Sequence, residues 1–113
     1  MEDINRYCCT GRVIREPRMA ETPSGSPVMN LSVAVRERWR NAETGAREDR
    51  SSVLPVVVFG AYATVLEPLV TKGSLVCLDG SLRASSWVRD GERHTKLQVV
   101  ADHVRVIGQA GRP

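Results

Sequence analysis

The stretch Asn-Leu-Ser-Val-Ala-Val-Arg at residues 30–36 alternates apolar and polar or small side chains with a period of two. Leu31, Val33 and Val35 fall on one side of an extended chain, and the residues between them fall on the other side. Such alternation is typical of a β-strand with one face in a core and the other in solvent. The stretch therefore predicts a half-buried strand.

Further apolar runs lie on both sides of this strand, and turn signals separate them. The runs cover residues 5–14, 53–59, 76–87 and 93–107. A polar loop with a central glycine is predicted at 41–49, and a tight turn at Arg89-Asp90-Gly91-Glu92. Residues 61–70 predict a short helix, in which Pro68 has no N–H to donate to the carbonyl of Thr64.

The order of these elements is three strands, a helix and two more strands. This is the order of the OB-fold, a mainly β architecture built as a five-stranded Greek-key barrel with one short helix between strands 3 and 4. We predict one such domain over residues 1–107 and a short flexible C-terminal tail at 108–113. A small β-barrel of another topology would fit the same runs.

The composition argues against membrane, secreted and disordered classes of protein. Hydrophobic residues make up 42% and charged residues 26% of the 113 residues. No apolar run reaches the roughly 18 residues of a membrane span, and charges interrupt residues 1–12, where a signal peptide would be apolar. The three cysteines, at positions 8, 9 and 77, form no C-x-x-C motif and predict reduced thiols in a cytoplasmic protein.

The basic residues are almost all arginine, since the only lysines are Lys72 and Lys96. The net charge of +3 favours polyanionic partners only weakly. If the protein binds nucleic acid, arginine must supply most of the positive charge, and only five aromatic rings are present for stacking.

Trp39 lies beside the polar loop among three arginines, Arg36, Arg38 and Arg40. An aromatic ring interleaved with guanidinium groups is typical of a nucleic-acid-binding surface, although a solvated, charged strand end would show the same pattern. Alternation places Trp39 on the core face of its strand. A bulge or a strong twist near residues 36–38 would be needed to expose it.

Two further rings are candidates for stacking. Trp87 shares the outward face of its run with Arg83, and Phe59 ends the run 53–59. An exposed ring beside an arginine suits a nucleobase and its flanking phosphate, because every base has a π-face. The alternatives are that Trp87 packs under a loop or at a subunit interface, and that Phe59 belongs to the core.

Signals for catalysis, cofactors or metals are poor. Lys72-Gly73-Ser74 lacks a preceding Gly-rich loop, and Pro23-Ser24-Gly25-Ser26-Pro27 lacks the G-x-S-x-G pattern of a nucleophilic serine. The carboxylates cluster beside arginines, as in surface ion pairs, and His94 and His103 are too isolated for a zinc site. We therefore expect a protein that is not an enzyme, with no catalytic residues, cofactor, metal or small-molecule substrate.

A series of short stretches supports a more specific interpretation through its order and spacing. The stretches are Asn5-Arg6, Gly11-Arg12, Glu16-Pro17, residues 22–25, 36–40, 57–60, 72–76 and 80–83, Trp87, and residues 99–102. In this order the sequence resembles the bacterial single-stranded DNA-binding protein (SSB) family over nearly its whole length. The resemblance implies an OB-fold protein of the bacterial cytoplasm and nucleoid that binds and protects single-stranded DNA, without sequence preference, in replication, recombination or repair. It also implies a homotetramer, with a dimer as the alternative.

Carried over position by position, the resemblance assigns base stacking to Trp39, Phe59 and Trp87. It assigns phosphate contacts to Arg6, Lys72 and Arg83, and the pattern around Trp39 adds three arginines to them: Arg36, Arg38 and Arg40.

The sequence also departs from the family pattern. A further stacking position is Val53, and usually basic positions are occupied by Pro55 and by Ser85-Ser86. These losses predict weaker binding than in relatives and a flatter salt dependence, because each phosphate contact contributes about −0.7 to the log–log slope on single strands. The family's disordered linker and acidic C-terminal tip have no counterpart in Gly108–Pro113. Either this tail has been removed or the protein naturally lacks it. The resemblance therefore does not determine which replication or repair proteins are bound.

These departures support an alternative. A tail-less OB protein resembles primosomal replication protein N (PriB), a replication-restart accessory protein that acts mainly through protein partners. The run Leu54-Pro55-Val56-Val57-Val58 favours this family, whereas Trp39 and Trp87 favour the SSB family.

Overall fold

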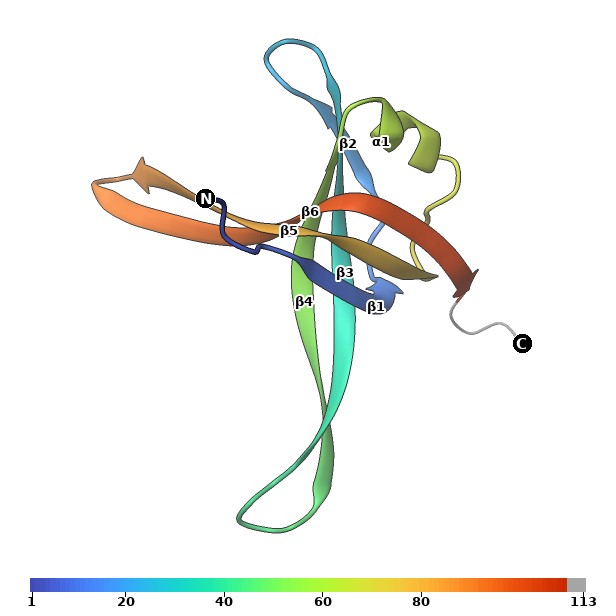
Figure 1. The fold of residues 1–113 in the computed structure, drawn as a ribbon, viewed down its shortest axis with the longest axis vertical. Helices are drawn as coiled ribbons and strands as arrows, with labels where there is room; N and C mark the ends of the chain where they lie inside the picture. The colour runs from blue at the N-terminus through green and yellow to red at the C-terminus, as the bar shows by residue number, and fades with distance from the viewer. Residues whose placement is uncertain (110–113) are drawn as a thin grey trace.

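The computed structural model describes residues 1–109, which form six β-strands and one short helix (Figure 1). The strands are β1 (Tyr7–Val13), β2 (Arg18–Glu21), β3 (Pro27–Arg40), β4 (Arg47–Phe59), β5 (Ser74–Arg89) and β6 (Glu92–Gln109). The helix α1 (Ala61–Leu66) lies between β4 and β5. The prediction of a mainly β fold with one short helix is therefore confirmed.

The sheet closes on itself as a five-stranded barrel. Its strand order is β1-β5-β6-β4-β3-β2, and additional pairing between β1 and β3, which includes Val13 opposite Val33, closes the barrel. All neighbouring strands are antiparallel except β4 and β6, which pair in parallel at Val56 and Val99. The short strand β2 pairs only with the first part of β3. This is the predicted OB-fold barrel.

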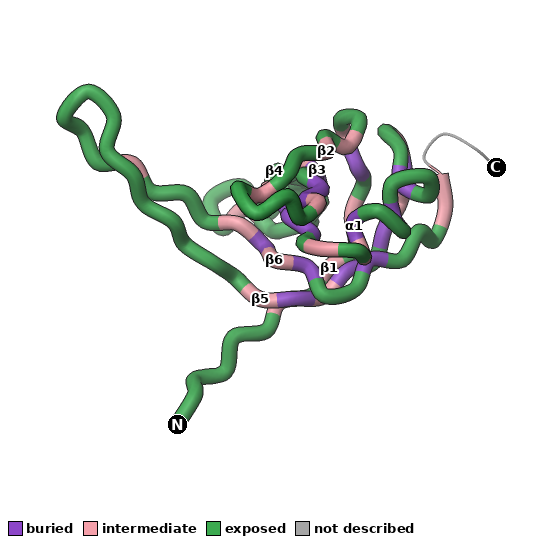
Figure 2. Tube along the Cα trace, turned by 90° about the horizontal axis from the view of Figure 1, so that it is seen from above, coloured by how far each residue is buried: buried purple, intermediate pink, exposed green. Residues whose placement is uncertain are grey.

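Alternation along β3 builds the core as the sequence indicates. Leu31 and Val33 are buried, and they pack with Val56 and Val58 of β4 and with apolar residues of the other strands. Asn30 is exposed because it lies on the opposite face of β3. Figure 2 shows the buried residues in the barrel and on the side of α1 that packs against it, whereas the hairpin formed by β5 and β6 is almost entirely exposed along its outer half.

Two long hairpins project from the barrel in different directions (Figure 1). We call residues 36–51 the β3–β4 arm and residues 83–98 the β5–β6 arm; both are two-stranded. The radius of gyration is 16.3 Å, compared with about 13 Å for a compact domain of this length, because the arms extend beyond the barrel. Both faces of each arm can therefore meet solvent or a ligand.

The helix and one glycine show how local sequence shapes the barrel. The backbone hydrogen bonds of α1 end near Pro68. The Tyr62 hydroxyl joins α1 to β6, because it accepts a hydrogen bond from the Val104 N–H at 2.9 Å and donates one to the Val104 carbonyl at 3.0 Å. Gly80 lies at an irregularity of β5, where a Cβ would be 1.9 Å from the Val100 carbonyl oxygen. Glycine is therefore required for the close approach of β5 to β6.

Several predicted boundaries were wrong. The loop at 41–49 ends earlier, because Arg47–Asp49 pair with Arg38–Arg40 as part of β4. Strand β2 was not predicted, and β6 continues to Gln109, two residues into the predicted tail. The rest of that tail, 110–113, lies outside the described residues. Within 1–109 no helix is long and apolar enough to cross a membrane.

Candidate nucleic-acid interface

The three predicted stacking rings are all partly accessible. The exposed fraction is 37% for Trp39, 41% for Phe59 and 42% for Trp87. They lie on three separate parts of the molecule, namely the β3–β4 arm, the end of β4 beside the barrel, and the β5–β6 arm. None of the three belongs to the buried core cluster, and each ring has a cationic or aromatic neighbour.

Trp39 is exposed because its arm leaves the barrel. Strand pairing runs without a bulge from Val28 opposite Phe59 to Arg40 opposite Arg47, so Trp39 keeps the parity of the core residues of β3. Beyond the barrel that face has no core to contact. The guanidinium carbon of Arg50 lies 4.8 Å from the centre of the Trp39 ring, a cation–π distance.

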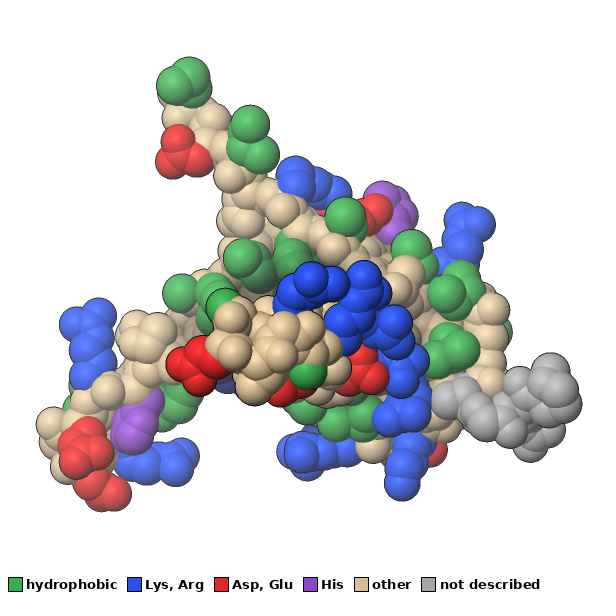
Figure 3. Space-filling model, turned by 90° about the horizontal axis from the view of Figure 1, so that it is seen from below, with side chains coloured by type: hydrophobic (Ala, Val, Ile, Leu, Met, Phe, Trp, Pro, Cys, Tyr) green, Lys and Arg blue, Asp and Glu red, His purple; other side chains and the backbone are tan. Residues whose placement is uncertain are grey.

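Arginines surround Trp39 at the end of the arm. Arg38, Arg40 and Arg47 line a hollow of about 350 Å³ together with Trp39. Arg38 also pairs with Asp49 across the hairpin, with 3.3 Å between Nε and Oδ1. Figure 3, a view toward the end of this arm, shows Lys and Arg side chains gathered beside it. The arm thus places several guanidinium groups around one accessible ring, with carboxylates interspersed among them.

Phe59 and Arg83 come together although 24 positions separate them in the sequence. The guanidinium carbon of Arg83, on β5, lies 5.7 Å from the centre of the Phe59 ring at the end of β4. A base stacked near Phe59 would therefore meet a cation that can bind its phosphate.

Trp87 has a second ring beside it. His94 lies directly opposite Trp87 in the β5–β6 pairing. The two rings are stacked, with 5.7 Å between their centres and 22° between their planes. Together they form an aromatic surface that is wider than one indole.

The other predicted cations have different surroundings. Arg6 pairs with Asp79 at 3.4 Å and with Asp102 at 3.1 Å, so two carboxylates compensate its charge. Arg36, at the base of the β3–β4 arm, and Lys72, before β5, lie in separate hollows that both include Arg12.

Comparison with known proteins identifies the family. The profile of the Single-strand binding protein family matches residues 4–107, which is nearly the whole chain. The chain belongs to this family.

Individual relatives agree with this assignment. The single-stranded DNA-binding protein 1 of Streptococcus pyogenes is 33% identical over 91% of this chain and 76% of its own length. The single-stranded DNA-binding protein 1 of Xylella fastidiosa is 26% identical over 96% of this chain and 81% of its own length. Among solved structures, the Plasmodium falciparum SSB in complex with ssDNA has a TM-score of 0.87 at 21% identity, covering 96% of this chain and 98% of that one. At that identity the match supports the fold.

Two side chains of this SSB-family chain have shifted pKa values, and both lie on the inner side of β1. Burial raises the pKa of the Tyr7 hydroxyl to about 12 and also raises the pKa of the Cys9 thiol. Both residues pack against the core cluster. The shifts therefore reflect packing of the barrel and concern neither arm. Cys8 and Cys77 are exposed and, like Cys9, are free thiols.

Sequence reasoning missed several residues that lie beside the predicted rings and cations. Arg50 and His94 each neighbour a predicted tryptophan, and Arg12 neighbours two predicted cations. The partner of Trp87 could have been found by extending the pairing of the Asp90-Gly91 turn back to residues 87 and 94. The partner of Trp39 depends on the length of the loop at 41–46, which was predicted too long.

Proposed function

We propose that this chain binds and protects single-stranded DNA without sequence preference. Bases stack on Trp39, Phe59 and Trp87, and phosphates are held by the predicted cations: Arg6, Arg36, Arg38, Arg40, Lys72 and Arg83. The protein acts by binding and not as an enzyme, in replication, recombination or repair in the bacterial cytoplasm.

The observation that carries this proposal is the pairing of Phe59 with Arg83. Strand order separates β4 from β5 by β6, yet the chain places an accessible ring and a guanidinium group 5.7 Å apart. A ring with an adjacent cation fits the alternation of base and phosphate along a single strand. Trp39 with Arg50 repeats this combination on the β3–β4 arm. The relatives from Xylella fastidiosa and Streptococcus pyogenes, both named single-stranded DNA-binding proteins, support the same ligand.

Intrinsic fluorescence tests the proposal, because the only two tryptophans are both proposed stacking residues. Titration with an oligo-dT strand should quench the fluorescence, more strongly at low than at high salt. Variants Trp39→Phe and Trp87→Phe, each leaving one tryptophan, would separate the two arms. No quenching at low salt would contradict the stacking proposal.

Replacing Val53 with tryptophan is expected to strengthen binding. Val53 is 54% exposed on β4, opposite Ala34, so a larger side chain can be accommodated on the outer face. One additional stacked base contributes about 1–3 kcal/mol, which is at least about a fivefold gain in affinity. Anisotropy of a labelled oligo-dT strand measures the gain. Val65→Trp on α1, at a site with 59% exposure, is the matched control and should leave the affinity unchanged. A folded Val53→Trp protein with unchanged affinity would contradict the prediction.

We further propose that the protein assembles as a homotetramer. In β1 only Arg12 and Val13 pair with β3, so among the described residues the outer edge of 7–11 has no strand beside it. An open edge is a site where a second copy can add its own strand. Light scattering should give a mass of four copies of the 12.4 kDa chain. A dimer mass would contradict this assembly and favour the primosomal type of protein.

A further inference from the structure

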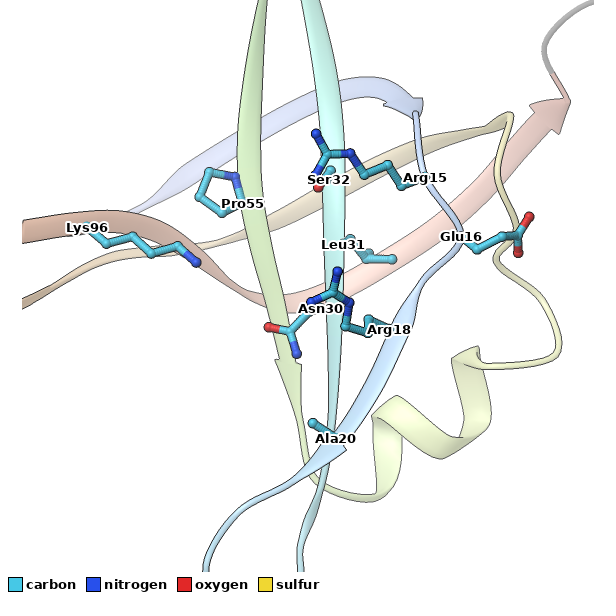
Figure 4. A pocket seen from close by; sticks show the side chains of 9 residues that line it. All are labelled: Arg15, Glu16, Arg18, Ala20, Asn30, Leu31, Ser32, Pro55 and Lys96. Atoms are coloured by element: carbon cyan, nitrogen blue, oxygen red, sulfur yellow. The ribbon is translucent and has the colours of Figure 1, made fainter.

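A hollow of about 470 Å³ lies on the outer side of β3 and β4 (Figure 4). Asn30 and Ser32 of β3 and Pro55 of β4 contribute to its lining. Alternation turns these residues away from the core, since their neighbours Leu31 and Val56 are buried. The hollow therefore belongs to the surface of the barrel, and a ligand can enter it without unfolding the core.

Three cations reach this hollow from opposite sides. Arg15 and Arg18 come from the segment around the start of β2, and Lys96 comes from β6, as Figure 4 shows. Within residues 1–109 none of the three has a carboxylate oxygen within ion-pair distance. The three cations are therefore free of ion pairs within the described residues.

The carboxylate that lines the hollow is turned away from it. Glu16 Oε1 accepts a hydrogen bond from the backbone N–H of Lys72 at 3.1 Å, on the side of the barrel where β5 begins. Figure 4 shows the Glu16 carboxylate pointing away from the three cations. Glu16 thus holds the chain segment that carries Arg15 and Arg18 while leaving their charges free for a ligand.

The chemistry of the lining suits phosphate groups. Guanidinium groups bind phosphate oxygens through two parallel hydrogen bonds, and an ammonium group adds a point charge. The Asn30 amide and the Ser32 hydroxyl supply further donors on the outer face of β3. All three cations are exposed, which fits a chain of phosphates lying across the surface better than an enclosed small molecule.

The hollow is continuous with the proposed stacking surface. Lys96 lies opposite Ser85 in the β5–β6 pairing, and two residues away on the same face His94 lies opposite Trp87. In the other direction the same face continues to Arg83, whose guanidinium group lies above Phe59. A strand stacked on Trp87 and passing toward Phe59 would therefore run along the edge of the hollow.

We propose that Arg15, Arg18 and Lys96 form a phosphate-binding subsite that holds the backbone of a single strand between Trp87 and the outer face of β3 and β4. The subsite rests on the proposed function and adds to it three residues that neither the motifs nor the ring environments indicated. It supplies charge close to Pro55 and Ser85, where the resemblance led us to expect fewer phosphate contacts.

The test compares two variants that each lose two positive charges. Arg18→Gln plus Lys96→Gln removes a cation from each side of the hollow. Arg93→Gln plus Arg105→Gln is the matched control, because Arg93 is on the opposite face of the β5–β6 arm and Arg105 lies opposite Cys77. Affinity for a labelled oligo-dT strand of about 30 nucleotides is measured between about 50 and 200 mM salt.

The subsite variant should lose about 1.4 from the magnitude of the log–log salt slope, because each phosphate contact contributes about 0.7. When the salt is lowered fourfold, the affinity of the control rises with an unchanged slope. The affinity of the subsite variant should rise by a factor about sevenfold smaller. Adding Arg15→Gln should remove about 0.7 more. Quenching of tryptophan fluorescence at saturation should be the same in all variants, since the rings are untouched.

The possible failures are distinguishable. If the wild type binds and is quenched while the subsite variant keeps the slope of the control, the subsite is overturned and the proposed function stands. If the wild type neither binds nor is quenched, both are overturned. If the subsite variant keeps the salt slope of the wild type but loses binding of a decaglutamate peptide, the hollow docks an acidic peptide, and the subsite is overturned. The single variant Lys96→Gln, with an expected change of about 0.7, serves if the double variant is unstable.

Discussion

Replacing Trp39 and Trp87 together with alanine is expected to lower the affinity for single-stranded DNA by about 2–6 kcal/mol, because each stacked base contributes about 1–3 kcal/mol. This corresponds to roughly a 30-fold to 10⁴-fold loss. The two rings lie on different arms and share no partner, so their contributions should add. Anisotropy of a labelled oligo-dT strand long enough to reach both arms measures the loss.

The control must show that the loss comes from the rings. Both tryptophans are more than a third exposed, so the variant should melt close to the wild type, as followed by circular dichroism. Val88→Ala plus Leu97→Ala removes two exposed apolar side chains from the other face of the β5–β6 arm. This control should bind normally. An equal loss in the control, or full binding by the folded tryptophan variant, would contradict the assignment of the rings.

Gly80→Ala is expected to destabilise the fold by about 3 kcal/mol or more, at the upper end of the range for overpacked sites. A Cβ at this position would lie 1.9 Å from the Val100 carbonyl oxygen and 2.8 Å from the Ala101 Cα. Both are backbone atoms of β6, so no change of rotamer can relieve the contact. Urea unfolding should show the loss, and the melting temperature should fall by about 10 °C or more.

Gly108→Ala is the matched control for this prediction. Gly108 also lies in β6, but a Cβ there would first meet the end of the Leu75 side chain at 3.4 Å, an ordinary contact. Its unfolding free energy should stay within about 1 kcal/mol of the wild type at the same protein concentration. Equal stability of Gly80→Ala and the wild type would show that β5 and β6 can separate locally without cost.

Much of the barrel could be predicted because burial repeats locally. The alternation at residues 30–36 and the position of Pro68 correctly indicated the strand and the short helix that the structure contains. Strand β2 was missed because its four residues, Arg-Met-Ala-Glu, are too short to show a period and are mostly exposed. The arms were predicted too short because beyond the barrel both faces are solvated, so Arg47–Asp49 show no alternation of burial.

The charged neighbours of the rings illustrate a different limit. The sequence placed Arg36, Arg38 and Arg40 around Trp39, and in the structure the cation over the ring is Arg50 of the facing strand. Lys96 is 78 positions from Arg18 in the sequence, yet it lines the same hollow as Arg18 and Arg15. The expected shortage of phosphate contacts followed from usually basic family positions that are Pro55, Ser85 and Ser86 in this chain. That comparison takes one position at a time and does not include cations that other strands bring alongside.

The sequence alone established the kinds of residues that this protein uses: alternating apolar residues for a small barrel, three candidate stacking rings and an excess of arginine. These properties depend on spacing along one chain segment, which local geometry converts into a face. Which cation accompanies which ring depends on the folded chain, as with Arg83 above Phe59. The physical reason is that closure of the barrel sets the register between strands far apart in the sequence, and that register determines where each side chain lies.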